Sequence, residues 1–396
     1  MEIVAAIDSF KGSMTSVQAG KAAAKGIHKV DPEAKVHVRP LADGGEGTVE
    51  ALVSGMNGTI RKVSVTGPIG KTVVCEYGVI ENTGGKTEEK TAVIEIAKAA
   101  GLTLLSEEER NPLYTTTYGV GEVIKDAVRN GCRKFIVGIG GSATNDGGAG
   151  MLQALGFGLL KENGEQIPIG ARGLEELAEI TDDNVIPELA ECKFKIACDV
   201  TNVLCGETGA SAVYGPQKGA DEEMTERLDR LLFSYASLVK KKIPKADSMY
   251  PGTGAAGGLG FAFLTFMDAQ LESGIQIVIK ETGLEQEIAK ADLVITGEGR
   301  MDGQTAMGKA PIGIAKIAKK YGKPVIAFAG AAARDAGACN EQGIDAFFPI
   351  LREAVSLEAA MKRENAEANM EAAVEQAYRS VSYTHLRAHE TCADLV

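Results

Sequence analysis

Short apolar runs alternate with helix-like stretches near both ends of the chain. IVAAI (3–7), ADLVIT (291–296) and PVIAFAG (324–330) have the length and composition of buried strands. Apolar strands that alternate with helices are typical of a parallel sheet covered on both faces. We therefore expect an α/β protein with a doubly wound, parallel-sheet domain of the flavodoxin or Rossmann-like type.

The pattern changes between residues 58 and about 97. TIRKVSVTG, KTVVCEYGVI and KTAVIEI have the pattern of successive strands joined by glycine-containing turns, which predicts a meander. Because the first and last parts of the chain share one pattern, we expect a discontinuous Rossmann-like domain made of residues 1–57 and 282–381. A second, mixed α/β domain, residues 58–281, would be inserted into it.

The last fifteen residues, SYTHLRAHETCADLV (382–396), break the pattern of the amphipathic helix predicted over 357–381. They resemble a translated cloning scar, so we interpret them as a non-native tail and leave them out of the fold. A genuine but disordered terminus is the alternative. The tail also contains two of the four histidines, and we expect the other two, His28 and His37, to be structural or surface residues.

Composition narrows the range of partners. The net charge of −12, the absence of Trp and the low aromatic content argue against a nucleic-acid-binding surface. No apolar run approaches the roughly 18 residues that a membrane span needs. Seven scattered cysteines without a C-x-x-C pair, and no recognisable targeting segment, favour reduced thiols in a cytoplasmic protein. We expect no nucleic-acid or membrane partner.

Glycine is enriched, at 48 of 396 residues, and it clusters in polar loops that follow predicted strands. Such loops bring backbone close to a ligand, and ligands of open α/β sheets bind at the carboxyl ends of strands. Three of these loops are DSFKGS (8–13), ADGGEGT (42–48) and TGEGRMDGQTAMGK (296–309). They supply the candidate binding residues Asp8, Ser9, Lys11, Ser13, Asp43, Gly44, Gly45, Glu46, Glu298, Arg300, Asp302, Gln304, Thr305 and Lys309.

The chemistry expected of these loops follows from their residue types. Lys11 and the amides of a helix N-terminus suit a phosphate or a carboxylate. The acids and glycines of the second loop suit a divalent cation or a substrate hydroxyl.

The richest loop is GIGGSATNDGGAG (138–150), in which backbone amides predict a nest for phosphate oxygens. Its candidate residues are Gly140, Gly141, Ser142, Thr144, Asn145 and Asp146, the last of which would hold magnesium or fix the loop. CDVTN (198–202) contributes Asn202 and Asp199. We expect Asp199 to be a base, a metal ligand or the cap of the next turn. GTGAAG (252–257) lacks a preceding strand, so a dinucleotide site is disfavoured, although Gly257 remains a nucleotide contact.

Phosphoryl transfer fits this set of residues best. The chain has several glycine loops, acids, a few lysines and no candidate His or Cys nucleophile, and phosphoryl transfer depends mainly on positioning and charge neutralisation. GPIGKT (67–72) and GGKT (84–87) lack the spacing of a P-loop, and we expect both to be turns between strands. Two alternatives stay open, a nucleotide-dependent dehydrogenase and a non-catalytic sensor of phosphorylated metabolites.

Seven motifs occur in one order and resemble those of the bacterial type I glycerate kinase family: DSFKGS, ADGGEGT, YTTTYGVGE, VGIGGSATNDGGAGMLQALG, DVTN with GPQKGA, GAAGGLG and TGEGRMDGQT. The resemblance covers about residues 1–380. It implies a two-domain kinase that uses ATP and Mg²⁺ to phosphorylate D-glycerate, with 2-phosphoglycerate favoured as the product.

On that basis we expect particular roles for four acids and one lysine. Asp199 is the first choice for the catalytic base and Asp8 is its competitor. Lys11 would bind the phosphate or the carboxylate of glycerate, and Asp146 and Asp302 would be the metal ligands. The sequence gives no indication of the oligomeric state.

Overall fold

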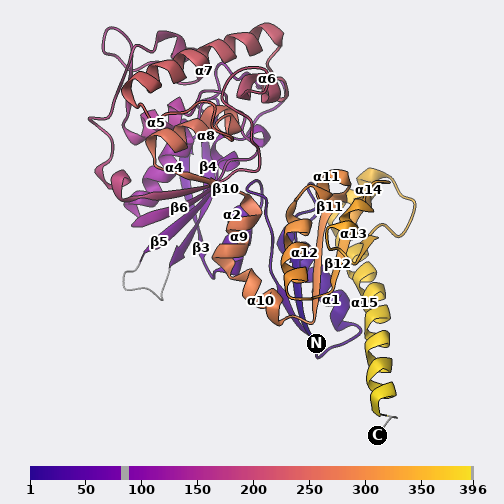
Figure 1. Ribbon diagram of the computed structural model, residues 1–396. Helices are drawn as coiled ribbons and strands as arrows, with labels where there is room; N and C mark the ends of the chain where they lie inside the picture. The colour runs from indigo at the N-terminus through magenta and orange to yellow at the C-terminus, as the bar shows by residue number, and fades with distance from the viewer. Residues whose placement is uncertain (82–88, 394–396) are drawn as a thin grey trace. The chain divides into compact units, whose positions relative to one another are not determined.

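The computed structural model of the protein describes residues 1–81 and 89–393, so the GGKT turn expected at 84–87 lies outside the described residues. The chain divides into two compact units (Figure 1). The first consists of Met1–Ala42 together with the chain from Val278 onward, and the second is Asp43–Ile277.

Unit 1 is built on a five-stranded sheet in the order β13-β12-β11-β1-β2, and all of its strand pairs are parallel. The strands are β1 (Glu2–Ile7), β2 (Lys35–Val38), β11 (Leu293–Met301), β12 (Val325–Ala332) and β13 (Ala346–Pro349). β1, β11 and β12 are mostly apolar and buried, as expected for strands covered on both faces, whereas the edge strands β2 and β13 are only partly buried.

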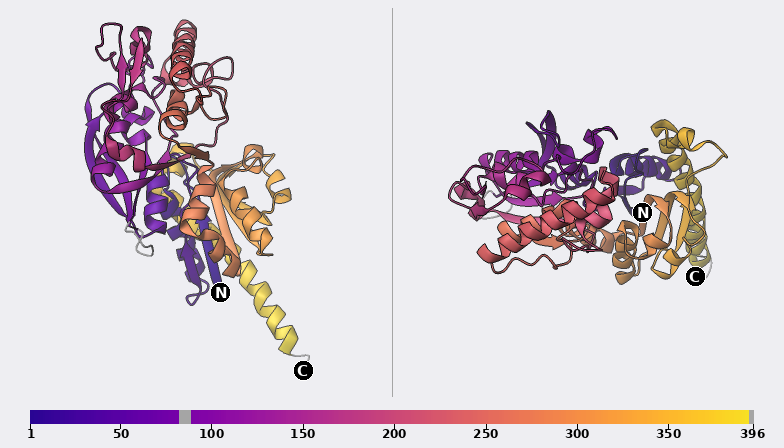
Figure 2. Two further views of the ribbon diagram at one scale, coloured as in Figure 1. Left: turned by 60° about the vertical axis from the view of Figure 1, so that its left-hand side comes forward. Right: turned by 90° about the horizontal axis from the view of Figure 1, so that it is seen from above.

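Helices cover both faces of this sheet. α1 (Ser16–His28) and α15 (Arg363–Ala393) pack against each other and share a core with the sheet (Figures 1 and 2). α10 (Leu284–Lys290) and α12 (Ala310–Lys320) contact each other and, separately, β1, β11 and β12. The doubly wound parallel-sheet prediction is therefore confirmed. The backbone of α15 runs as helix to Ala393, whereas we expected the helical pattern to stop near residue 381.

Unit 2 contains a six-stranded mixed sheet in the order β10-β9-β6-β5-β4-β3. β3 to β5 form the antiparallel meander predicted from the sequence, and β5, β6, β9 and β10 run parallel. The strands are β3 (Thr59–Thr66), β4 (Thr72–Glu81), β5 (Lys90–Glu95), β6 (Cys132–Gly138), β9 (Lys193–Ala197) and β10 (Gln270–Glu272). GPIGKT forms the β3–β4 turn, in which the Gly67 amide donates to the Lys71 carbonyl at 2.7 Å.

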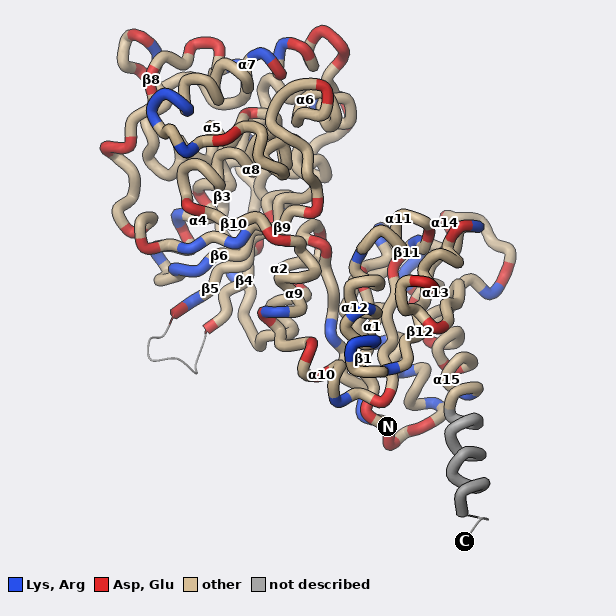
Figure 3. Tube along the Cα trace, viewed as in Figure 1, with Lys and Arg blue, Asp and Glu red and all other residues tan. Residues whose placement is uncertain are grey.

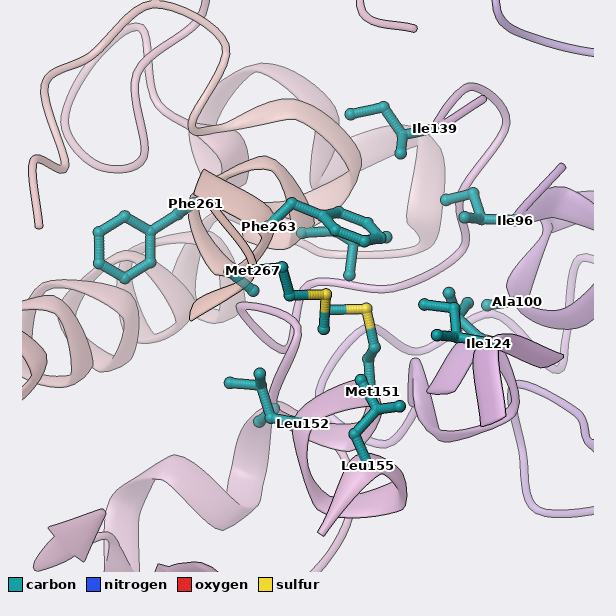
Figure 4. Packing of buried hydrophobic residues seen from close by; sticks show 14 of the residues in the cluster. Ile96, Ala100, Ile124, Ile139, Met151, Leu152, Leu155, Phe261, Phe263 and Met267 are labelled. Carbon is teal, nitrogen blue, oxygen red and sulfur yellow. The ribbon is translucent and has the colours of Figure 1, made fainter. Parts of the chain in front are cut away.

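The helices of unit 2 include α4 (Tyr118–Arg129), α5 (Ala149–Leu155), α7 (Glu222–Lys242) and α8 (Ala255–Phe266). Figure 4 shows Met151 and Leu155 of α5 and Phe263 of α8 gathered in the buried apolar cluster of this unit. A hairpin of β7 (Gly158–Leu160) and β8 (Glu179–Thr181) lies outside the main sheet. The core fixes the start of α5, where the richest glycine loop ends.

The first boundary between the units falls after residue 42, earlier than the expected residue 57. The reason is α2 (Thr48–Gly55), which packs on β4 and β5 of unit 2. Its Val53 side chain approaches Gly78 so closely that a Cβ there would lie 2.5 Å away. The helix therefore belongs with the meander that follows it.

Charged positions of both signs are interspersed along the described part of the chain (Figure 3). No helix within residues 1–81 and 89–393 combines the length and the apolar character that crossing a bilayer requires.

Candidate active site

In unit 1, two of the predicted loops meet at the carboxyl ends of adjacent strands. β1 and β11 pair with Ile7 opposite Gly297, and the Asp8 amide donates to the Gly297 carbonyl at 2.9 Å. The DSFKGS turn therefore lies beside the TGEGRMDGQT segment, whose first residues, up to Met301, continue strand β11 instead of forming the loop that we expected. Asp8 is buried and accepts a hydrogen bond from the Ser9 amide at 2.7 Å, whereas Lys11 is exposed. Ser13, half-buried, lies in the same turn.

Glu298 is the buried carboxylate of this cluster. Its Oε1 accepts a hydrogen bond from the Thr305 hydroxyl at 2.6 Å. Burial raises the pKa of Glu298, while the Thr305 hydrogen bond and the positive charges of Lys309 and Lys11 oppose that rise. Both lysines are thus close enough for their charge to act on this carboxylate, which makes the cluster a site of mixed charge.

Asp302 begins α11 (Gly303–Ala306) as its N-cap residue. Its Oδ1 accepts from the amides of Gln304 at 3.0 Å and Thr305 at 3.2 Å. Arg300 Nε lies 3.5 Å from its Oδ2, and Lys309 Nζ lies 3.9 Å from its Oδ1. Gln304 and Thr305 therefore serve the turn through their amides, and the largely exposed Arg300 side chain is accessible to a ligand.

Glu298 and Asp302 are the candidate Mg²⁺ ligands at this edge of the sheet. Thr305 links the two carboxylates, because its hydroxyl donates to Glu298 Oε1 and its amide donates to Asp302 Oδ1 at 3.2 Å. Proteins commonly hold Mg²⁺ with one or two carboxylates, the remaining ligands being phosphate and water oxygens. Glu298 and Asp302 fit that pattern. Among the described residues, no three His, Cys, Asp or Glu side chains gather to hold a metal without such added ligands.

In unit 2, the ADGGEGT loop rests on the ends of β6 and β9. Gly44 has a φ of +90°, and a Cβ there would lie 2.7 Å from Ala197 Cβ. The Gly140 amide donates to the Gly44 carbonyl at 3.3 Å. Glycine is required at 44 both for its backbone conformation and for this close approach. The loop thereby brings Asp43, whose Oδ1 accepts from the Gly45 amide at 3.1 Å, to the carboxyl edge of this sheet.

Asp199 follows β9 at the same edge. Its Oδ1 accepts a hydrogen bond from the Gly274 amide at 3.2 Å. The protein packed around the carboxylate raises the pKa of Asp199, and the negative charge of Asp43 adds to that rise, while hydrogen bonds from Ser273 and Gly274 oppose it. The residue is nevertheless exposed, so water screens part of these effects. An accessible carboxylate with a raised pKa can accept a proton from a ligand hydroxyl.

The GIGGSATNDGGAG loop is divided between surface and interior. Gly141 is exposed and Gly140 half-buried, whereas Ser142 is buried at 5% exposure and Thr144 and Asn145 are fully buried. Because the Gly140 amide already donates to the Gly44 carbonyl, the exposed Gly141 is the accessible part of the expected phosphate nest.

The buried part of this loop packs against protein. Asn145 Nδ2 donates to Ser211 Oγ at 2.9 Å. The Gly257 carbonyl accepts from the Gly147 amide at 2.9 Å, and a Cβ at 257 would lie 2.0 Å from the Thr144 carbonyl. These contacts favour packing roles for Thr144, Asn145 and Gly257 over the ligand contacts that we expected.

Asp146 is fully buried, and its carboxylate accepts four hydrogen bonds. The donors are the Thr117 amide at 2.8 Å, the Thr117 hydroxyl at 2.9 Å, and the amides of Gly148 at 3.1 Å and Gly150 at 3.2 Å. This environment favours the loop-fixing role over the metal-ligand role. Thr117 belongs to the YTTTYGVGE motif, so the two motifs support each other inside unit 2.

Asn202 also bonds within the protein. Its Nδ2 donates to the Thr208 carbonyl at 2.9 Å, and its Oδ1 accepts from the Tyr214 hydroxyl at 2.6 Å. The residue organises the loop after Asp199, and this arrangement favours an indirect role in ligand binding.

Sequence reasoning missed two buried charged residues. Lys218, in the GPQKGA motif, donates from Nζ to the Thr144 carbonyl at 2.7 Å, and burial lowers its pKa to about 7 against the opposing pull of Asp146. Glu95 accepts from the Val49 amide at 2.8 Å at the start of α2. In the sequence, the position of Lys218 in the GPQKGA motif was the feature that could have drawn attention to it. Glu95 ends an apolar strand, where a buried carboxylate gives no distinctive pattern.

The sequence and the structure are both similar to those of known proteins. A family model described as the glycerate kinase family matches residues 3–382. A glycerate kinase of Halalkalibacterium halodurans is 49% identical over 91% of this chain and 93% of its own length. The Escherichia coli K12 protein named glycerate 2-kinase is 46% identical with the same coverage. A crystal structure from Salmonella typhimurium LT2, provisionally named glycerate kinase 2, superposes with a TM-score of 0.87 at 44% identity, covering 98% of this chain and 99% of that one.

Proposed function

This chain belongs to the glycerate kinase family, and from that premise we propose that it transfers the γ-phosphate of ATP to a hydroxyl of D-glycerate. The observation that carries the proposal is the cluster at the ends of β1 and β11. It combines two carboxylates, Glu298 and Asp302, with two lysines, Lys11 and Lys309. Phosphoryl transfer requires such neutralisation of phosphate charge together with acids that can share a magnesium ion.

Glu298 and Asp302 are the residues that would hold Mg²⁺ in this proposal. When bound, the ion would neutralise charge on the phosphates that accompany it. Lys11, a flexible point charge on an exposed turn, would bind a phosphate oxygen or the carboxylate of glycerate. Gly141, which is exposed, would offer its backbone amide to a phosphate, and Gly140 would support the loop through its bond to Gly44.

Asp199 is the preferred proton acceptor for the attacking hydroxyl. It is exposed, whereas its competitor Asp8 is buried. A base must lie within hydrogen-bond reach of the proton that it removes, which favours the accessible group.

Direct in-line transfer without a P-loop is the mechanism we propose. The one described segment that resembles a P-loop, GPIGKT, is a hairpin turn between β3 and β4. The name of the Escherichia coli relative supports the 2-hydroxyl of glycerate as the acceptor. The cytoplasm as the location stays a prediction from the sequence.

A coupled assay for ADP release distinguishes a kinase from a sensor. Purified protein with MgATP should release ADP when D-glycerate is added and not in its absence. Glycerate that binds, as measured by calorimetry, without any ADP release would instead favour a non-catalytic sensor.

A further inference from the structure

The dipeptide Ser273–Gly274, at the start of α9 (Gly274–Thr282), contacts the acids at the edge of the unit 2 sheet. The Gly274 amide donates to Asp199 Oδ1 at 3.2 Å, and the Ser273 side chain lies close enough to Asp199 to lower the pKa of that carboxyl. Neither residue belongs to one of the seven sequence motifs. Two successive residues therefore act on one carboxylate, Gly274 through its backbone amide and Ser273 through its side chain.

Gly274 also sets how closely Asp43 approaches. A Cβ at position 274 would lie 2.3 Å from the carbonyl carbon of Asp43 and 2.4 Å from the Gly44 nitrogen. Real Cβ atoms do not come that close to backbone atoms, so any side chain at 274 has to displace the Asp43–Gly44 peptide. The absence of a side chain is thus what allows Asp43 to lie beside Asp199.

We propose that Ser273 and Gly274 are positioning residues for the Asp43–Asp199 carboxylate pair. Ser273 orients the Asp199 carboxylate through its hydroxyl, and Gly274 holds Asp199 through its amide while making room for the Asp43 backbone. This inference rests on the proposed function, in which Asp199 accepts the proton of the substrate hydroxyl.

The Ser273–Gly274 dipeptide should have a measurable effect on the pKa of Asp199. Burial and the nearby Asp43 charge raise the pKa of Asp199, and the Ser273 and Gly274 hydrogen bonds lower it. The Cys198 thiol is the other titratable group that interacts with Asp199, and burial raises the pKa of that thiol. Loss of the Ser273 donor should therefore raise the pKa of Asp199 further, so that the base becomes protonated at a higher pH.

The test compares Ser273→Ala with Ser273→Thr, which keeps the hydroxyl. With ATP and D-glycerate, Ser273→Ala should lower kcat by about tenfold, as expected for a lost hydrogen bond to a charged group, and leave KM for ATP unchanged. The acidic limb of its kcat–pH profile should move to higher pH. Ser273→Thr should restore both values.

Ser356→Ala is the matched control for Ser273→Ala, and Gly337→Ala is the matched control for Gly274→Ala. Ser356→Ala removes the hydroxyl that caps another helix, in unit 1, and should leave the pH profile unchanged. Gly274→Ala should lower kcat because it displaces the Asp43 peptide. Gly337→Ala, in unit 1, places its Cβ in open space and should have no effect.

A separate readout keeps this inference distinct from the proposed function. NMR titration of ¹³C-labelled aspartate reports the Asp199 pKa in wild type and in Ser273→Ala, with or without catalysis. A higher pKa in Ser273→Ala supports the positioning role even if Asp199→Asn retains kcat and the base is reassigned. An unchanged Asp199 pKa, or a Ser273→Thr variant that behaves like Ser273→Ala, would overturn the proposal. The serine variants decide the matter even if Gly274→Ala does not fold.

Discussion

The ammonium group of Lys218 donates a hydrogen bond to the carbonyl oxygen of Thr144 at 2.7 Å, inside the core of unit 2. Lysine is almost never fully buried unless it is paired. Here it connects the GPQKGA segment to the middle of the glycine-rich loop, 74 residues earlier in the chain. Burial lowers its pKa to about 7, with Asp146 opposing, and this shift affects stability.

The stability contributed at position 218 should rise with pH. Between about pH 7 and the ordinary lysine value of about 10.4, the unfolded chain binds a proton at Lys218 that the folded chain does not. The free energy of unfolding therefore increases with pH across this window. Chemical denaturation of wild type and Lys218→Met should show a wild-type minus variant difference that is larger at pH 9 than at pH 7. The same comparison for the exposed Lys241→Met should show no such change.

Asp146→Asn should destabilise the fold by about 2–4 kcal/mol, because an amide cannot accept all four hydrogen bonds that the carboxylate accepts. Denaturant unfolding measures this loss. If Asp146 were instead a metal ligand, the variant would keep its stability and require more Mg²⁺ for turnover.

Turnover should depend on a divalent cation and stop in excess chelator. Asp302→Asn should then raise the Mg²⁺ concentration needed for half-maximal rate by about tenfold, since it removes one carboxylate charge from the proposed pair. Replacing the exposed Glu353 by Gln provides a matched control on the same unit, with no expected change. Full activity after exhaustive removal of metal would rule out this part of the account.

Asp199→Asn keeps the size of the side chain and removes the base. We expect kcat to fall by about 100-fold or more, with KM for ATP little changed. Because the pKa of Asp199 is raised, wild-type kcat should decline as the pH falls through that raised value. Kinetics of Asp199→Asn beside Asp8→Asn decide between the two acids. A near-normal kcat in the first and a large loss in the second would assign the role to Asp8.

The main strands and most of the loops at their ends were predictable because both depend on local patterns. Apolar runs identified the strands, but only the structure shows that β1 and β11 are neighbours, which brings the turn at Asp8 beside the end of β11. The domain boundary was not predictable in the same way. α2 follows a strand of unit 1 in sequence, and only its packing on β4 and β5 assigns it to unit 2.

Local sequence patterns also could not predict which residues of the glycine-rich loop are buried. Asn145 bonds to Ser211, 66 residues away, and Gly257 packs on Thr144, so their burial depends on contacts between distant segments. A polar loop rich in glycine indicates close backbone approach, but it does not distinguish a ligand from another part of the protein. Lys218 escaped notice for the same reason, since no local feature predicts that a lysine is buried.

Phosphorus NMR of the purified protein with MgATP and D-glycerate tests the central claim most directly. The account predicts that the γ-phosphate signal of ATP decays while the signals of ADP and of a phosphomonoester grow at equal rates. Proton coupling should identify that monoester as 2-phosphoglycerate. An unchanged ATP spectrum, or inorganic phosphate in place of the monoester, would contradict the assignment of this chain as a glycerate kinase.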